Sequence, residues 1–128
     1  MLPNRRDAAA LWDIGKAARL IREFIADRDQ QSFSETPMCH FAVIAQLQII
    51  GEATKRLSTP FREAHPAIPW REMAGMRDIL IHLYDRVDLN EVWLAATESI
   101  PNLLDEIEPL LDEGLPGNGP DAQPSGED

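Results

Sequence analysis

Apolar residues recur every three or four positions through most of the chain, which is the spacing of one face of an α-helix. In the first segment this stripe consists of Leu11, Ile14, Ala18, Ile21 and Ile25. Asn4 is suited to the N-cap, and the helix is predicted to extend to about Asp27. The segment QQSFSET, which follows, is interpreted as a turn.

A second helix is predicted from Pro37 to about Leu57, because proline is favoured in the first turn of a helix. Around FAVIAQLQII it is apolar on more than one side, as expected for a helix that lies centrally or at a subunit interface. Gly51 within it costs about 1 kcal/mol relative to alanine. A close crossing with another helix would explain this glycine.

Residues 60–68 are predicted to be a short irregular or single-turn connection, and Pro69 opens a third helix. The last helix begins at the N-cap Asp88 and extends to about Asp112, with a kink or break expected near Pro101. The core stripe of the third helix is predicted to be Met73, Met76, Leu80 and Leu83. These elements predict an all-α fold, an antiparallel bundle of four to five helices.

Composition and charge divide the chain into a helical domain, 1–115, and a tail, 116–128, that is acidic, rich in Pro and Gly and expected to be disordered. Of the net charge of -10, residues 101–128 carry eight acidic side chains and no basic one. RNA binding by the remainder is therefore compatible with the charge. The chain has no apolar run of membrane-spanning length and no signal peptide, so we expect a cytoplasmic protein. Cys39 is its single cysteine, so no internal disulfide is expected.

The segment most suited to chemistry is Arg77-Asp78-Ile79-Leu80-Ile81-His82-Leu83-Tyr84. Histidine can exchange a proton near neutral pH, whereas arginine stays charged and binds phosphate oxygens. Cleavage of RNA by its own ribose hydroxyl needs such a base and such a donor. In a straight helix Arg77 and His82 stand about 140° apart with a rise of about 7.5 Å. Either the helix ends near His82, or a second chain completes the site, which the off-stripe Ile81 favours.

Taken singly, each of these residues has a common structural interpretation. Asp78 and His82 could form an ordinary surface pair, and Arg77 could pair with Glu72 or Asp85. No metal or cofactor is expected, because the three histidines lie on different segments and no glycine-rich phosphate loop is present. His40 and His65 are interpreted as structural residues.

The stretch from Ile68 to Tyr84 resembles the HepT-like toxins of the HEPN superfamily. Ile50-Gly51-Glu52-Ala53 upstream, and Val87-Asp88-Leu89 with Val92-Trp93 downstream, extend the similarity over roughly residues 8–111. The resemblance implies a helical ribonuclease that forms a homodimer with its active cleft at the interface. It implies that Arg77 and His82 are a metal-independent catalytic pair acting on RNA.

The resemblance also implies a type VII-like toxin–antitoxin system, in which an MntA-like nucleotidyltransferase antitoxin attaches AMP to Tyr84. The added charge and bulk would obstruct RNA. Asp78 departs from the asparagine of many relatives, which puts substrate binding or the tuning of His82 in doubt. Glu52 is either a buried partner of Arg77 or a substrate contact. The alternative function is a non-catalytic nucleotide-binding or scaffold subunit of a nucleotidyltransferase complex, and dependence on His82 separates the two.

Overall fold

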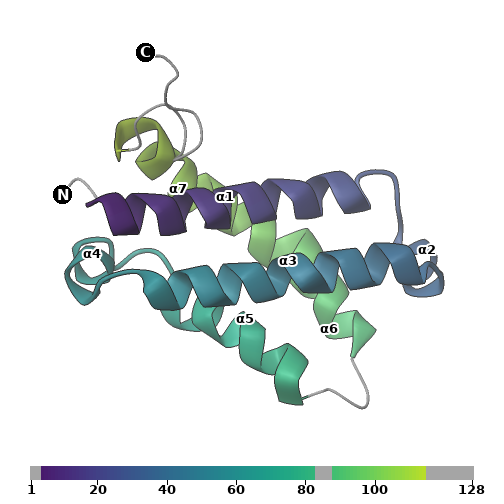
Figure 1. Cartoon of the computed structure of the whole chain (residues 1–128). Helices are drawn as coiled ribbons and strands as arrows, with labels where there is room; N and C mark the ends of the chain where they lie inside the picture. Colours follow the sequence, from purple (N-terminus) through teal and green to yellow (C-terminus); the bar gives the residue numbers. More distant parts are fainter. Residues whose placement is uncertain (1–3, 83–87, 115–128) are drawn as a thin grey trace.

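The computed structural model describes residues 4–82 and 88–114, without the side chains of 78–82 and 112–114. The described residues contain helices and no strand. The elements are α1 (Arg5–Ile25), α2 (Gln30–Glu35), α3 (Pro37–Arg56), α4 (Thr59–Ala64), α5 (Trp70–His82), α6 (Leu89–Leu94), the π-helix η1 (Ala95–Ser99) and α7 (Ile100–Gly114). Helices α1, α3, α5 and the continuous α6–η1–α7 segment alternate in direction (Figure 1). The predicted all-α antiparallel bundle is confirmed.

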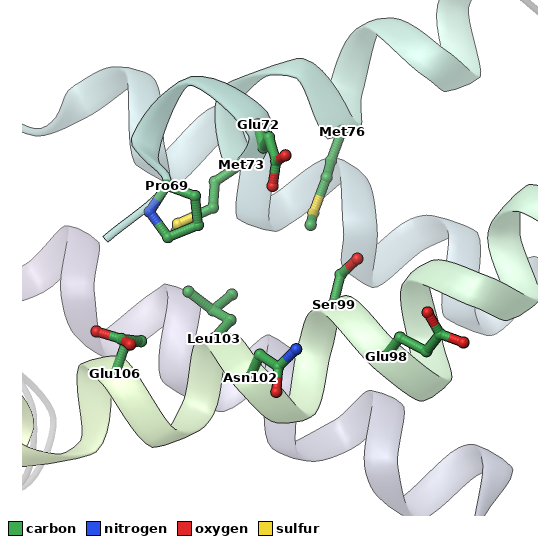
Figure 2. A pocket seen from close by; sticks show the side chains of 9 residues that line it. All are labelled: Pro69, Glu72, Met73, Met76, Glu98, Ser99, Asn102, Leu103 and Glu106. Atoms are coloured by element: carbon green, nitrogen blue, oxygen red, sulfur yellow. The ribbon is translucent and has the colours of Figure 1, made fainter. Parts of the chain in front are cut away.

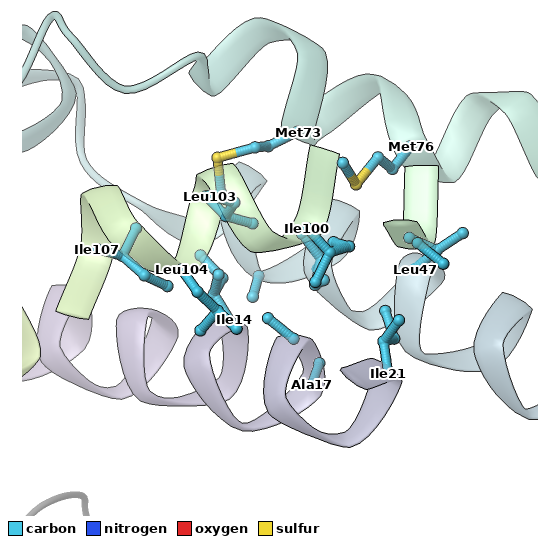
Figure 3. Packing of buried hydrophobic residues seen from close by; sticks show 14 of the residues in the cluster. Ile14, Ala17, Ile21, Leu47, Met73, Met76, Ile100, Leu103, Leu104 and Ile107 are labelled. Carbon is cyan, nitrogen blue, oxygen red and sulfur yellow. The ribbon is translucent and has the colours of Figure 1, made fainter. Parts of the chain in front are cut away.

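Helix α3 is the central element, because it packs against α1 along one side and against α5 along the other (Figure 1). The core between the long helices is filled by aliphatic and methionine side chains of α1, α3, α5 and α7 (Figure 3). The stripe predicted for the first helix is confirmed, since Leu11, Ile14, Ala18 and Ile21 are fully buried and Ile25 at its end packs partly buried against the core. Burial of these side chains is the main driving force for assembling the bundle.

The segment QQSFSET is not merely a turn: residues Gln30–Glu35 form helix α2. The Asp29 side chain caps this helix by accepting a hydrogen bond of 2.8 Å from the Ser32 N–H. Phe33 is fully buried and packs against the rings of His40 and Trp93. A helix of this length shows too little periodicity to be recognised in the sequence, and its stability comes from the cap and one buried aromatic.

The irregularity expected near Pro101 is present as the π-helical turn η1, which ends immediately before α7. Proline lacks an N–H and its ring crowds the preceding turn, so a widened turn on its N-terminal side accommodates it. Thr97 lies within this turn and donates its hydroxyl to the Trp93 carbonyl at 2.8 Å. A second proline, Pro109, lies inside α7 and was not anticipated.

A buried carboxylate joins the start of α1 to the start of α4. Asp7 is 1% exposed and accepts hydrogen bonds from both the N–H and the hydroxyl of Ser58, each at 2.7 Å. Ser58 in turn caps α4 by accepting from the Phe61 N–H at 3.2 Å. These contacts fix the end of α3, from which the residues of the candidate site project. In the described part of the chain, no helix has the length and apolarity required to cross a membrane.

Candidate active site

Helices α3 and α5 approach most closely where Gly51 meets Arg77. A Cβ atom built on Gly51 would lie 2.7 Å from the Arg77 Cβ and 2.8 Å from its backbone nitrogen. Because backbone atoms cannot move aside as a flexible side chain can, only glycine fits this position without a shift of the helices. The close crossing predicted from the sequence is confirmed, and it places the Arg77 backbone directly against α3.

The Arg77 guanidinium forms an ion pair with the residue that follows Gly51. Its Nε lies 2.6 Å from Oε2 of Glu52. Of the two readings of Glu52, partnership with Arg77 is therefore present, but the expected burial is wrong. The two side chains are 37% and 56% exposed, because this face of α3 opens onto a groove. A guanidinium has more N–H donors than one carboxylate accepts, so the pair leaves donors for a further anion.

This groove has a volume of about 760 Å³ and lies where α1, α3 and α5 meet. Its lining consists of Asp13, Ala45, Gln48, Ile49, Glu52, Arg56 and Arg77. A second ion pair crosses it, with Nη2 of Arg56 2.6 Å from Oδ2 of Asp13. Sequence reasoning missed Arg56 and Asp13. The i, i+4 spacing of Glu52 and Arg56, which puts both on one face of α3, was the available clue.

The remaining motif residues follow Arg77 along α5 and beyond it. Helix α5 includes His82, so positions 77 and 82 belong to one helix and stand about 140° apart around its axis. Helix α5 ends at His82, as the first of the two predicted readings expected, and Arg77 lies about 1.4 turns before this end. The side chains of Asp78, Ile81 and His82, and Tyr84 as a whole, lie outside the described part of the structure.

A row of exposed apolar side chains, here called the α3 stripe, runs along the outer face of α3. Met38 is 86% exposed, Phe41 60% and Ile49 42%, and Ala45 between them is also exposed. Their spacing of three and four residues places them on one face. Ile49 also lines the groove, so the α3 stripe leads directly to Arg77. The apolar character expected of a central or interfacial helix is thus present on the outer face as well.

A second hollow, of about 440 Å³, separates the first half of α5 from η1 and α7 (Figure 2). Met73, Met76 and Leu103 form its apolar part, and three carboxylates, from Glu72, Glu98 and Glu106, stand around it. This concentration of negative charge repels a polyanion such as RNA. The groove at Arg77 is therefore the better candidate for a phosphate-binding site.

The other residues with potential for chemistry have structural surroundings. His40 is buried, and its Nδ1 lies 3.2 Å from the Phe33 carbonyl oxygen. The His65 ring packs on Phe61, with centroids 4.6 Å apart. Cys39 is a buried free thiol. Among the described side chains, His, Cys, Asp and Glu do not gather in groups of three or more that could hold a metal ion.

Comparison with known proteins gives one consistent result. The sequence profile of the family described as "Ribonuclease HepT-like" matches residues 14–110. The chain is 41% identical over 106 residues to "Putative RNase MJ1380" of Methanocaldococcus jannaschii, covering 82% of this chain and 97% of that protein. It is 46% identical over 100 residues to "Probable ribonuclease HepT" of Thermococcus cleftensis, covering 78% and 91% of the two chains. No solved structure matches the chain.

The chain therefore belongs to the HepT-like ribonuclease family. Its enzyme class is that of an endoribonuclease. The resemblance noted in the sequence is confirmed at the level of the family.

Proposed function

We propose that this chain is the ribonuclease toxin of a toxin–antitoxin pair and that it cleaves RNA without a metal ion. The observation that carries the proposal is the position of Arg77: beside a groove, held by Glu52, and five residues before His82 on one helix. In this mechanism Arg77 holds the scissile phosphate and stabilises the charge that develops on it. His82 moves the proton of the attacking 2'-hydroxyl as its oxygen bonds to phosphorus. The bond from phosphorus to the 5'-oxygen breaks, and this oxygen leaves as a protonated hydroxyl, so that one product ends in a 2',3'-cyclic phosphate.

Glu52 acts in this proposal as a positioning residue. A side chain as long as arginine loses considerable rotamer freedom when it is held in one place. The contact of Glu52 with Nε fixes the guanidinium at the rim of the groove before the substrate arrives. The terminal nitrogens can then receive phosphate oxygens in the planar arrangement that favours arginine over lysine at such sites.

A second copy of the chain completes the site. Positions 77 and 82 stand on different sides of α5, so a substrate held by Arg77 of one chain needs a surface that brings a histidine from another direction. The α3 stripe supports such a surface, because its exposed apolar side chains end at Ile49 in the groove itself. A two-fold axis across the α3 stripe would bring the two grooves together in one composite cleft.

Tyr84 is the proposed point of neutralisation by a nucleotidyltransferase antitoxin. It follows His82 by two residues, so an adenylyl group attached to its hydroxyl would carry a negative phosphate next to the catalytic histidine. This phosphate would compete with RNA for the Arg77 guanidinium and repel the substrate backbone. Support for this step comes from the motif alone, since Tyr84 lies outside the described residues.

The proposal is tested by RNA cleavage in EDTA with purified wild-type protein, Arg77→Ala, His82→Ala and Arg71→Ala. Arg71 is the matched control, because it is an exposed arginine on the same helix that does not line the groove. We expect wild type and Arg71→Ala to cleave, and the other two variants to lose at least a hundredfold in rate, the scale of a lost catalytic acid–base group or charge-stabilising donor.

Equal cleavage by all four proteins would refute the assignment of Arg77 and His82. Intact mass before and after phosphodiesterase treatment identifies protein that was purified with AMP attached. An unmodified dimer that leaves several RNAs intact would instead support a non-catalytic scaffold function.

A further inference from the structure

Arg56 is a second arginine in the same groove as Arg77, and the motif does not include it. It lies in the last turn of α3, one helical turn after Glu52. Glu52, which holds Arg77, and Arg56 are separated by about 6 Å of rise along α3. Both line the groove of about 760 Å³. We propose that Arg56 binds the phosphate of the RNA strand that neighbours the scissile phosphate, an inference that rests on the proposed function.

The geometry of Arg56 suits such a role. Its side chain is 51% exposed, so a strand in the groove can reach it. The described ion pair uses Nη2 and one oxygen of Asp13, and the guanidinium keeps other donors for a phosphate. The lining of the groove also includes the amide of Gln48 and the apolar side chain of Ile49, about one turn before Glu52 on α3. These groups can contact a nucleotide without adding negative charge.

A purely structural ion pair is the competing explanation, and the chain contains one for comparison. Arg19 and Glu108 join α1 to α7 at 3.3 Å, and Arg19 is 51% exposed, the same as Arg56. Exposed pairs of this kind contribute little to stability. Arg19 does not line the groove. Both arginines are equally exposed and both pair with a carboxylate, but only Arg56 lines the groove in which RNA is proposed to bind.

Asp13 acts in this proposal as an internal competitor for the phosphate. Its carboxylate occupies Nη2 of Arg56 and carries a negative charge into the groove. RNA binding must displace this contact or share the guanidinium with it. Replacing Asp13 with asparagine removes the charge at nearly constant volume. This change should strengthen RNA binding, because it frees the Arg56 guanidinium and removes a negative charge that repels the strand.

The test is fluorescence anisotropy of a labelled single-stranded RNA whose 2'-hydroxyls are methylated, so that binding is measured without cleavage. Affinity is determined against KCl concentration for wild type, Arg56→Gln, Arg19→Gln and Asp13→Asn. Each phosphate contact contributes about 0.7 to the slope of log affinity against log salt for a single strand. We expect Arg56→Gln to lose this amount and to bind about tenfold more weakly, with Arg19→Gln unchanged and Asp13→Asn several-fold tighter.

Identical slopes for Arg56→Gln and Arg19→Gln would overturn the assignment of Arg56, as would a wild type that does not bind the RNA. The proposed function fails separately, when wild type binds the methylated strand but leaves the unmethylated strand intact. Thermal unfolding of each variant verifies that the fold is retained, which the exposure of both ion pairs predicts.

Discussion

The contact between Gly51 and Arg77 makes a quantitative prediction about three glycine-to-alanine substitutions. Within a helix, alanine is favoured over glycine by about 1 kcal/mol. At Gly51 the new Cβ would lie 2.7 Å from the Arg77 Cβ and 2.8 Å from its backbone nitrogen. Overpacking against groups that cannot move costs about 1–3 kcal/mol. The clash offsets or outweighs the gain in helix propensity, and we expect a net loss of up to about 2 kcal/mol for Gly51→Ala.

Gly75 on α5 is the matched control, because a Cβ there would meet no atom within 4 Å. Gly75→Ala should therefore gain most of the propensity term, about 0.5–1 kcal/mol. Gly15→Ala is intermediate, since the nearest atoms to its Cβ would belong to the Leu111 side chain, with Cδ1 at 2.7 Å, and the end of a leucine side chain can rotate away. Replacing glycine with alanine is thus expected to lower the free energy of unfolding at Gly51 and to raise it at Gly75.

Urea unfolding followed by far-UV circular dichroism measures the three variants against wild type. We expect a lower midpoint for Gly51→Ala, a higher one for Gly75→Ala and equal slopes, with thermal shifts of about 4 °C per kcal/mol. RNA cleavage by Gly51→Ala should also fall, because the shifted crossing moves Arg77 away from the groove. The reasoning is refuted if Gly51→Ala is as stable as Gly75→Ala and cleaves RNA at the wild-type rate.

Three further predictions concern other parts of the molecule. Asp7→Ala should lower the free energy of unfolding by about 2–4 kcal/mol, because it removes the acceptor of two buried hydrogen bonds from Ser58; chemical denaturation measures this, and a loss below the error of the method contradicts it. Phe41→Glu should give a folded monomer in sedimentation velocity, because it charges the α3 stripe; an unchanged dimer would exclude this face as the interface. Glu52→Ala should lower kcat about tenfold with little change in KM, and Glu52→Gln should recover part of it by accepting from Arg77; equal loss in both variants would argue against a positioning role.

Much of the fold was predictable because a long helix places an apolar residue on its buried face every three or four positions, and this pattern recurs over several turns. The stripe of α1 and the proline at the start of α3 each follow from local rules, and the structure confirms them. The glycine in α3 was also informative, since an unfavourable residue in a helix needs a compensating contact. Short helix α2 was missed, because one buried ring at Phe33 stabilises it rather than a periodic pattern.

The candidate site was predictable only in part, for a physical reason. Arg77 and Glu52 belong to recognisable motifs, so their association could be anticipated. The pair of Arg56 and Asp13 joins residues 43 positions apart, and the anchor between Asp7 and Ser58 joins residues 51 apart. Such contacts depend on how two helices pack, and neither partner carries a local pattern that identifies the other. Exposure of the α3 stripe likewise depends on which face the rest of the bundle covers.

The most direct test of the central claim compares two RNA strands that differ only at the cleaved position. Wild-type protein in EDTA is given one strand with its natural 2'-hydroxyl and one with a 2'-deoxy sugar there, and the products are identified by mass spectrometry. Attack by the ribose hydroxyl, with His82 moving its proton and Arg77 holding the phosphate, predicts cleavage of the first strand alone, with a cyclic phosphate on the product. Equal cleavage of both strands, or cleavage that appears only when a divalent cation is added, would contradict the account.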